Sequence, residues 1–393
     1  MQSKNSQSLH RIVDVSPYTP LAIGFGGIAR STGAYLLALL ASKRTNTQVV
    51  LISTTASMRG HVSAKSVENA YPGLRAHLYN PIFSKKWGVG LGLFIYLPII
   101  FVSDLVVIHG TRNWPSVIAA SICRLFGRPY FVVGHATLDV SRMQRTQAKR
   151  KVLYSVTSRA VIWSVRGASA IIVSGPLERH ALPESVNKIP VVEIENFYDF
   201  DLSRSPSEVV PTRRRYLFVG RIESDKGILA FIQIWKSVAS PDSTLVIVGS
   251  GAGKYFDDVT SAIHGNGRIT YLGELEKKEL QEVMLASSIL VLPTGLDDPV
   301  TENFGNTVAE ALIFGRPAMV TKGLHWDKYA SSPALVIFEK NEGAVAQAIR
   351  EFDQVDDVTY RQMSTAAAQL SQEFHISKAV SQLRKLIDNV LGA

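Results

Sequence analysis

The sequence predicts an α/β protein built from two doubly wound domains, and three observations lead to that prediction. Short apolar runs alternate with longer amphipathic segments through most of the 393 residues, a pattern that produces parallel sheets with helices on both faces. A polar stretch broken by two prolines, residues 197–215, separates two halves of this kind. The chain is also long enough for each half to bury a core of its own.

Both halves supply their own expected elements. Strands are expected at 11–15, 48–53, 104–109, 130–134, 170–174 and 190–194, and then at 216–219, 244–248, 269–272, 288–292 and 318–321. Helical patterns fill the gaps, for example at 29–42, 115–126 and 146–167. The predicted domains are residues 1–200 and 201–375. Doubly wound sheets bind ligands beyond the carboxyl ends of their strands, so we expect the two domains to face a central cleft.

The composition is that of a folded globular protein, because 46% of the residues are hydrophobic and only 19% are charged. The single cysteine, Cys123, excludes an internal disulfide and a cysteine-based zinc cluster, and it fits a reducing compartment. The first ten residues are polar and show no signal peptide. We therefore expect a cytoplasmic protein.

One apolar run raises the question of a membrane. Residues 89–103 carry no charge, but a spanning helix needs about 20 apolar residues. This run is shorter and contains Pro98 and two glycines, Gly90 and Gly92. We expect a buried helix or strand here, with contact at a membrane interface as the alternative.

The net charge of +9 is spread unevenly. The segment 140–177 contains no acidic residue and carries the cations Arg142, Arg145, Lys149, Arg150, Lys151, Arg159 and Arg166. This fits either a solvated helix face or a surface that meets anionic lipid headgroups or a phosphorylated lipid acceptor, and the residues favour neither. Nucleic acid is not an expected partner, because no binding motif accompanies the charge.

Two glycine-rich stretches resemble nucleotide-binding motifs without matching them. Gly24, Gly26 and Gly27 approach a dinucleotide fingerprint, but residues 16–23 separate them from the preceding strand, which argues against a nicotinamide site. The segment instead suits a phosphate or a sugar at the start of a helix, or is a simple strand-to-helix turn. Residues 249–254 are one residue short of a P-loop, and we reject that interpretation.

The segment 302–317, ENFGNTVAEALIFGRP, carries the most chemistry. It follows an expected strand, and its helix is expected to start near Asn306 or Thr307, where backbone amides and the positive helix end favour a diphosphate. Glu310 could bind ribose hydroxyls, or it could be the far half of a capping box with Thr307. Glu302 could reach the attached sugar. The candidate donor-binding residues are Glu302, Phe304, Gly305, Asn306, Thr307 and Glu310.

Two further groups of residues follow expected strands. Arg221 and Lys226 lie in VGRIESDKG directly after 216–219, where cations would stabilise a diphosphate, although solvated surface charges would give the same pattern. His109 and His135 each end an expected strand of the first half. A histidine in such a place is more often a packing or hydrogen-bonding residue, and two of them shift the balance modestly toward a site.

These motifs resemble glycosyltransferase family 4, whose members are retaining enzymes with the GT-B fold of two Rossmann-like domains. The E-x7-E motif of the family is matched by Glu302 and Glu310. Its phosphate clamp is similar to Arg221 and Lys226 in VGRIESDKG. The resemblance extends over nearly the whole chain.

The first half resembles the family at two places. The glycine loop of the family is similar to residues 26–30, so Gly26 and Gly27 are candidate donor-binding residues. The family carries a histidine near the reacting sugar in a segment like HGxLD, which His135 and residues 136–139 match, with Ala136 in place of the usual glycine.

The resemblance implies that the protein transfers a hexose from a nucleoside diphosphate sugar, with retention at the anomeric carbon and with no metal or cofactor. Arg221 and Lys226 would stabilise the leaving diphosphate, and Glu310 would hold the ribose. Glu302 and His135 would contact the donor sugar. The last helix, 376–393, would cross back to the first domain.

The run ENFGN, with Trp326 downstream, is most similar to bacterial enzymes that assemble exopolysaccharide or lipopolysaccharide. This similarity implies a saccharide or lipid-linked acceptor and a peripheral position at the inner face of the cytoplasmic membrane, which the basic segment 140–177 would contact. Two alternatives stay open. One is a sugar-nucleotide epimerase of the same fold, and the other is a catalytically silent sugar-binding partner subunit.

Overall fold

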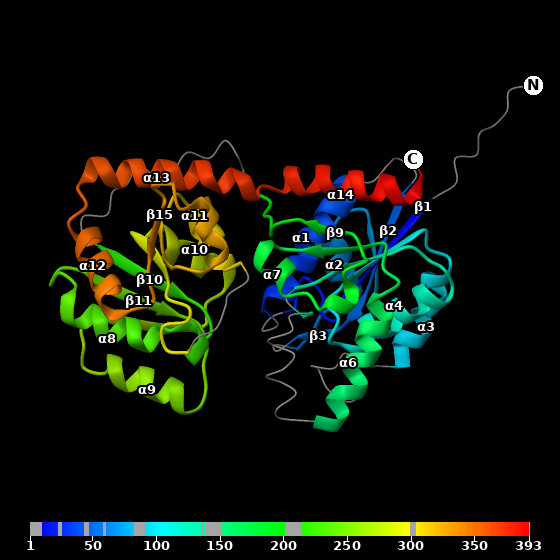
Figure 1. The fold of residues 1–393 in the computed structure, drawn as a ribbon, viewed down its shortest axis with the longest axis horizontal. Coiled ribbons are helices and arrows are strands. Elements are labelled where there is room, and N and C mark those ends of the chain that lie inside the picture. The colour runs from blue at the N-terminus through cyan, green and yellow to red at the C-terminus, as the bar shows by residue number, and fades with distance from the viewer. Residues whose placement is uncertain are drawn as a thin grey trace, which may run out of the picture. The chain divides into compact units, whose positions relative to one another are not determined.

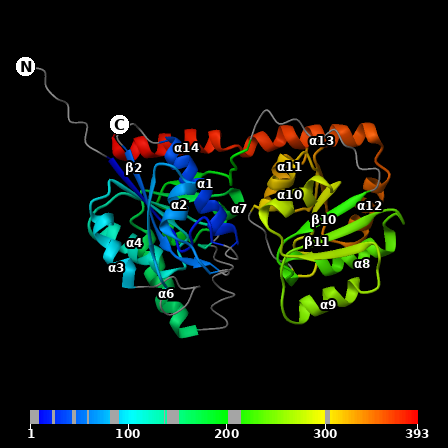
Figure 2. The ribbon, with the colours of Figure 1, turned by 180° about the vertical axis from the view of Figure 1, so that it is seen from behind.

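The computed structural model describes residues 10–22, 26–42, 47–57, 60–81, 91–135, 137–138, 151–200, 214–298 and 304–392. The chain divides into two compact units (Figures 1 and 2). Unit 1 comprises Met1–Asp199 together with Ile376–Ala393, and unit 2 comprises Phe200–His375. The chain therefore leaves unit 1 after Asp199 and returns to it at Ile376.

In the described part of unit 1, seven parallel strands form one sheet in the order β5-β2-β1-β6-β7-β8-β9. A short antiparallel pair, β3 and β4, lies apart from it. The strands are β1 (His10–Val15), β2 (Thr47–Thr54), β3 (Ala56–Ser57), β4 (Gly60–His61), β5 (Leu74–Tyr79), β6 (Leu105–His109), β7 (Tyr130–Val133), β8 (Ala170–Val173) and β9 (Val191–Glu193).

Helices cover both faces of this sheet. Successive strand residues point to opposite faces, so Val13 packs into one core cluster and Ile12 into the other. The first cluster includes residues of α3, α4 and α6, and the second includes residues of α1, α2 and α14. These helices and α7 are α1 (Gly26–Ser42), α2 (Ala64–Ala70), α3 (Leu91–Phe101), α4 (Trp114–Leu125), α6 (Lys151–Val165), α7 (Pro176–His180) and α14 (Ile376–Leu391).

The last helix belongs to unit 1. At its start, the backbone amide of Ile376 donates to the carbonyl of Tyr198, 2.9 Å away. Farther along, Arg384 donates to the carbonyl of Ala41 at 3.1 Å, at the end of α1. Leu383 and Ile387 on the same helix are buried in the core beside α1. An apolar stripe on α14 therefore completes one face of unit 1.

In the described part of unit 2, six parallel strands form a sheet in the order β12-β11-β10-β13-β14-β15. The strands are β10 (Arg215–Val219), β11 (Thr244–Val248), β12 (Ile269–Gly273), β13 (Ile289–Leu292), β14 (Ala318–Thr321) and β15 (Leu335–Phe338). The helices are α8 (Ile228–Val238), α9 (Lys254–Ile263), α10 (Lys277–Leu285), α11 (Asn306–Ile313), α12 (Glu342–Asp353) and α13 (Asp357–Ser371).

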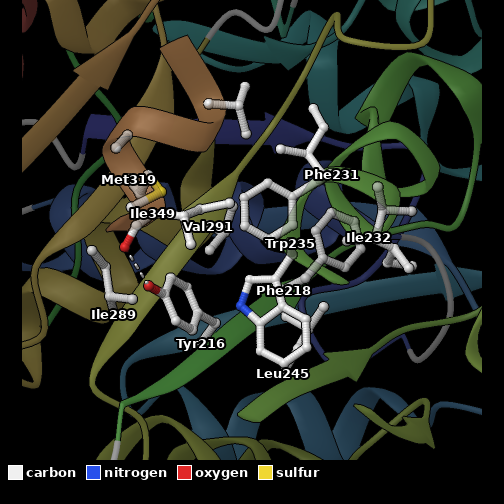
Figure 3. Close-up of a cluster of buried hydrophobic side chains, with 14 of the residues drawn as sticks. Tyr216, Phe218, Phe231, Ile232, Trp235, Leu245, Ile289, Val291, Met319 and Ile349 are labelled. Carbon is white, nitrogen blue, oxygen red and sulfur yellow. Dashed lines mark hydrogen bonds between the residues drawn. The ribbon is translucent and has the colours of Figure 1, made fainter. Parts of the chain in front are cut away.

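The core of unit 2 is built around aromatic side chains of β10 and α8 (Figure 3). Trp235 and Phe218 are fully buried, and each such side chain stabilises the fold by about 2 kcal/mol or more. Tyr216 is also buried, and its hydroxyl donates to Asp353 Oδ1 at 2.8 Å. The one polar atom of this side chain is thereby satisfied inside the core.

Parallel sheets with helices on both faces confirm the predicted α/β fold class in both units. The expected strands agree with the observed ones to within one or two residues at each end. Four observed strands, β3, β4, β5 and β15, were not predicted, and β3 and β4 have only two residues each. Strands β5 and β15 lie at the edges of their sheets and are only partly buried. Arg75 and His77 interrupt the apolar run of β5, whereas β15, LVIF, is apolar and was missed despite its pattern. Helix α1 begins at Gly26, three residues before its expected start.

The expectation that the apolar run 89–103 is buried is wrong in part. Residues 91–101 of this run form α3, and one face of the helix is exposed to solvent. The cause is geometric, because a helix that lies on a sheet can bury only the side that faces it. Within the described residues, no helix is long and apolar enough to cross a membrane.

Candidate active site

Three polar side chains meet near the carboxyl ends of the central strands of unit 1. Asp14 lies in β1, His109 is the last residue of β6, and His135 follows β7 after one glycine. Strand β6 pairs with both β1 and β7, so the three residues come from adjacent strands. Asp14 and His109 are fully buried, whereas His135 is half-buried. This is the edge at which doubly wound sheets bind ligands.

The three side chains form a hydrogen-bonded chain. Nε2 of His109 lies 2.9 Å from Oδ2 of Asp14, and Nδ1 of His109 lies 2.9 Å from Nε2 of His135. An ionised Asp14 can only accept, so Nε2–H of His109 donates to it. A neutral His109 then accepts at Nδ1, and Nε2–H of His135 donates. Nδ1 of His135 is left as an acceptor.

The surroundings favour this arrangement. Burial, and then the neighbouring His109 ring, hold the pKa of His135 well below its usual value, so the ring is neutral near pH 7. The two imidazoles are stacked, with 5.2 Å between their centroids. Tyr35 of α1 packs edge-on against His109 at 5.2 Å, and burial raises the pKa of the Tyr35 hydroxyl. The tautomer and orientation of His135 therefore depend on His109 and on the two residues that contact His109, Asp14 and Tyr35.

The backbone around His135 is also constrained. His135 has a φ of 47°, and it is the one non-glycine residue with positive φ among those that the structure describes. Such a conformation costs about 1–2 kcal/mol for an ordinary side chain. Thr137 helps to hold it, because its hydroxyl lies 2.6 Å from the carbonyl of Gly134 and accepts from the amide of Thr111. The loops after β6 and β7 are thereby joined.

A buried carboxylate lies behind Gly134. Glu178 of α7 is 2% exposed, and its Oε2 accepts from both the amide and the hydroxyl of Ser174 at 2.8 Å. A Cβ atom on Gly134 would lie 2.4 Å from Oε1 of Glu178. A glycine is therefore required just before His135, because a larger residue would displace this carboxylate.

In unit 2, the predicted cations lie in the loop after β10. Arg221 is exposed and pairs with Glu223, and its Nη2 lies 3.6 Å from Oδ2 of Asp225. Lys226 is half-buried at the end of a 3-10 turn, η2 (Ser224–Lys226), which precedes α8. The loop thus presents two cations beyond the carboxyl end of a central strand, with acidic partners on the same loop.

Close backbone contacts fix the shape of this loop. Gly227 has a φ of 69°, and a Cβ atom there would lie 2.0 Å from the carbonyl oxygen of Pro293. Gly249, which follows β11, has a φ of 139°, and a Cβ atom there would lie 1.8 Å from the carbonyl oxygen of Gly220. Only glycine permits both approaches. The loops after β10, β11 and β13 are therefore packed against one another.

Helix α11 begins at Asn306, as expected, and its N-cap is Gly305 with a φ of 72°. Thr307 is therefore the second helical residue and does not cap the helix. The alternative role of Glu310 as the far half of a capping box with Thr307 is wrong, because a capping box needs its acidic residue three positions after the N-cap. Glu310 lies one turn into the helix and is half-buried.

Phe304 anchors the chain just before α11. It is 3% exposed and packs against His325 at 4.7 Å, Trp326 at 5.4 Å and Phe374 at 5.6 Å between ring centroids. Trp326 is fully buried, so this residue is part of the core. Phe304 therefore fixes the position of the chain just before Gly305. Glu302 itself lies outside the described residues.

The predicted site residues thus fall into two groups. In unit 1, His135 is joined to His109, and Gly26 and Gly27 are the first two residues of α1. In unit 2, the loop with Arg221 and Lys226 follows β10, and the segment from Phe304 to Glu310 follows β13, which pairs with β10. Most of the basic segment's cations lie at 142–151, whose side chains are outside the described residues.

Three neighbours of His135 and His109 were not predicted from the sequence, namely Asp14, Tyr35 and Glu178. Asp14 could have been found, because an acidic residue inside the apolar strand RIVDV is costly unless it has a partner. Tyr35 and Glu178 lie in α1 and α7, and nothing in the local sequence distinguishes them from ordinary helix residues.

Comparison with known families finds a match within unit 2. Residues 213–353 match the family model of the glycosyl transferases group 1. The matched segment begins just before β10 and includes both the loop with Arg221 and Lys226 and the segment from Glu302 to Glu310. No curated protein matches the chain in sequence.

Solved structures share the fold over almost the whole chain. Sucrose-phosphate synthase from Thermosynechococcus elongatus has a TM-score of 0.76 at 17% identity, over 98% of this chain and 99% of that one. Anabaena HepE in complex with UDP has a TM-score of 0.71 at 15% identity, over 97% and 100%. A glycosyltransferase from Rickettsia africae has a TM-score of 0.70 at 15% identity, over 97% and 98%. These likenesses confirm the predicted GT-B fold.

Proposed function

We propose that the protein is a retaining, metal-independent glycosyltransferase of family 4 that transfers a hexose from a nucleoside diphosphate sugar. The observation that carries the proposal is the pair of neighbouring strand ends in unit 2, within the segment that matches the group 1 model. One strand leads to two cations, and the other leads to a helix start preceded by a left-handed glycine.

The diphosphate of the donor is proposed to bind at the start of α11. Backbone amides and the positive helix end favour an anion there, and Gly305 leaves the approach open. As the bond to the sugar breaks, negative charge grows on the diphosphate, and Arg221 and Lys226 would stabilise it. Arg221 would exchange its carboxylate partners on the loop for phosphate oxygens.

The two glutamates would bind the ribose and the sugar of the donor, which lie on either side of the diphosphate. Glu310, half-buried and one turn into α11, would accept hydrogen bonds from ribose hydroxyls. Glu302 would bind hydroxyls of the sugar. HepE, which shares the fold, is known in complex with UDP-glucose, which supports a nucleotide-sugar donor for this chain.

In unit 1, His135 is proposed to contact the donor sugar. With Nε2–H committed to His109, its Nδ1 can accept a hydrogen bond from a sugar hydroxyl. Asp14 and His109 would act as positioning residues that fix this tautomer. Gly26 and Gly27 would let a phosphate or sugar approach the start of α1. The acceptor would be a saccharide or a lipid-linked chain in polysaccharide or lipopolysaccharide synthesis.

The proposal is tested first by donor binding. A panel of UDP-, GDP- and ADP-sugars is screened by thermal shift, and one nucleotide should raise Tm, because a ligand at about 100 times Kd stabilises by about 2.7 kcal/mol. Incubation of that donor with and without lipid-linked acceptor then distinguishes transfer from epimerisation. Free nucleoside diphosphate and extended acceptor support the proposal, whereas isomerised sugar without acceptor would support the epimerase.

Variants assign the reaction to this site. Glu302→Ala, Lys226→Ala and His135→Ala should each lower transfer strongly, while Lys278→Ala, an exposed lysine on α10, should not. Polysaccharide assembly that survives all three substitutions would contradict the proposal and favour a silent sugar-binding subunit.

A further inference from the structure

The exposed face of α3 is an apolar stripe. The helix sequence LGLFIYLPIIF contains no charged residue, and Phe94, Ile95, Pro98, Phe101 and Val102 recur at positions that share one helical face. Phe94 is 53% exposed, Ile95 is 73% exposed, and Val102, just after the helix, is 59% exposed. The opposite side of α3 is anchored, because Leu93 and Ile100 are buried in the core.

The exposed apolar residues continue onto α4, which contacts α3, and onto α6, which contacts α4 (Figures 1 and 2). Phe126, at the end of α4, packs edge-on against Phe101 with 4.6 Å between centroids. Leu125 is 67% exposed, and Trp163 of α6 is 40% exposed. The guanidinium of Arg124 lies 4.4 Å from the Trp163 ring and joins α4 to α6.

We call this the α3–α6 surface, made of Phe94, Ile95, Val102, Leu125, Phe126 and Trp163. Nine large apolar side chains are exposed in the part of the chain that the structure describes, and these six are among them. Single exposed apolar residues are common, but a concentration of this kind marks a surface that meets a partner or a membrane.

The charge around the surface is mostly positive, with Asp104 two residues after Val102 as an acidic exception. Arg159, Trp163 and Arg166 recur at i, i+4 and i+7 on α6 and just beyond it, so the two arginines flank the tryptophan. Arg128 is exposed two residues after Phe126. From Leu105 to Leu177 the sequence contains ten lysines and arginines and one acidic residue, Asp139. The surface is therefore complementary to an anionic partner.

We propose that the α3–α6 surface docks on an anionic lipid bilayer and lies in its interface. An apolar stripe with tryptophan beside it and arginines around it combines burial among acyl chains with attraction to headgroups. At 11 residues α3 spans about 16 Å, roughly half of a hydrocarbon core, so it would lie in the interface and not cross it. The inference stands apart from sugar transfer.

The test is co-sedimentation of the full chain with vesicles of phosphatidylcholine alone and of phosphatidylcholine with phosphatidylglycerol, over a series of salt concentrations. Wild-type protein should bind the anionic vesicles, bind the neutral ones weakly, and lose affinity as salt screens the arginines. Equal binding to both vesicles, or no binding to either, would overturn the proposal.

Two sets of variants locate the surface. Ile95→Ser with Phe126→Ser should weaken binding about tenfold or more, because two large apolar groups leave the interface. Val358→Ser, which replaces an apolar residue of unit 2 that is 62% exposed, is the matched control and should change nothing. Arg128→Gln and Arg159→Gln should each weaken binding about fivefold, and Arg361→Gln of α13 should not.

The replaced side chains are exposed, so the variants should keep the wild-type Tm, and Tm is measured for each. The alternative partner of the α3–α6 surface is a second copy of the chain. Light scattering without vesicles tests this alternative by measuring whether the protein is a monomer or a dimer. A dimer that Ile95→Ser with Phe126→Ser dissociates, while vesicle binding stays at the wild-type level, would assign the surface to self-association and overturn the proposal. Vesicle binding that falls in a monomeric protein supports it.

Discussion

Nδ1 of His109 lies 2.9 Å from Nε2 of His135, and the other ring nitrogen of His109 lies 2.9 Å from the buried carboxyl of Asp14. A single side chain thus connects a carboxyl inside the sheet to a histidine at its edge. Each ring nitrogen of His109 has one partner. The position of the proton on His109 therefore determines which ring nitrogen of His135 can accept a hydrogen bond from a ligand.

This relationship predicts the effect of Asp14→Asn. An amide can donate or accept, so His109 is no longer held with its proton on Nε2, and His135 loses its single orientation. We expect kcat to fall by about a hundredfold at most, with donor affinity little changed. Histidine ring nitrogen shifts measured by NMR should show a changed tautomer at His109. Asp242→Asn, at an exposed aspartate, is the control, and an unchanged kcat in Asp14→Asn would contradict the positioning role.

The lowered pKa of His135 predicts a dependence of stability on pH. Its folded pKa lies well below the unfolded value of about 6.5, so below pH 6.5 the unfolded chain binds a proton that the folded protein does not. Stability should therefore be full above about pH 6.5 and fall as the pH falls toward the folded pKa. His135→Asn, which tolerates the positive φ, should reduce this fall in Tm. Parallel curves of Tm against pH for the wild type and His135→Asn would contradict this prediction.

The loop that carries Arg221 and Lys226 should not tolerate a side chain at Gly227. Gly227→Ala combines left-handed backbone with a Cβ atom 2.0 Å from the Pro293 carbonyl oxygen, so we expect a loss of about 3 kcal/mol or more in the free energy of unfolding. Gly265→Ala is the matched control. Its φ is 73°, but nothing lies within 4 Å, so only about 1 kcal/mol should be lost. Equal losses in chemical denaturation would show that the contact with Pro293 is unimportant.

The position of Glu310 predicts a separation between stability and donor binding. Glu310 does not cap α11, and glutamine keeps the size and one hydrogen-bonding oxygen of its side chain. Glu310→Gln should therefore change the free energy of unfolding by about 0.5 kcal/mol or less, while nucleotide affinity falls. Glu279 of α10 provides the contrast, since it accepts from the amide of Glu276 at 2.8 Å in a true capping box. Glu279→Ala should cost about 1 kcal/mol and leave nucleotide affinity unchanged. A similar loss of stability in both variants would restore a structural role for Glu310.

Much of the fold was accessible from local sequence patterns. Strands such as TLVIV at 244–248 and AMVT at 318–321 were predicted with their observed bounds, because central strands of a parallel sheet are apolar on both faces. The edge strand β5 was not, because the polar residues Arg75 and His77 on its partly exposed positions interrupt its apolar run. Strand β15, LVIF, was missed although its sequence is apolar. The exposed face of α3 was also not predicted, because an apolar helix sequence does not show which of its faces will pack against other elements.

For the candidate site, the sequence alone determined which residue types follow which strands, and therefore that His109, His135, Arg221, Lys226 and Glu310 are candidates. The resemblance to glycosyltransferase family 4 also came from the sequence, since motif spacing is a property of the chain. Only the tertiary structure decided that Asp14 and His109 stand behind His135 and that Gly305 caps α11. Those facts depend on contacts such as that between residues 14 and 109, and separations of this length leave no trace in local periodicity or spacing.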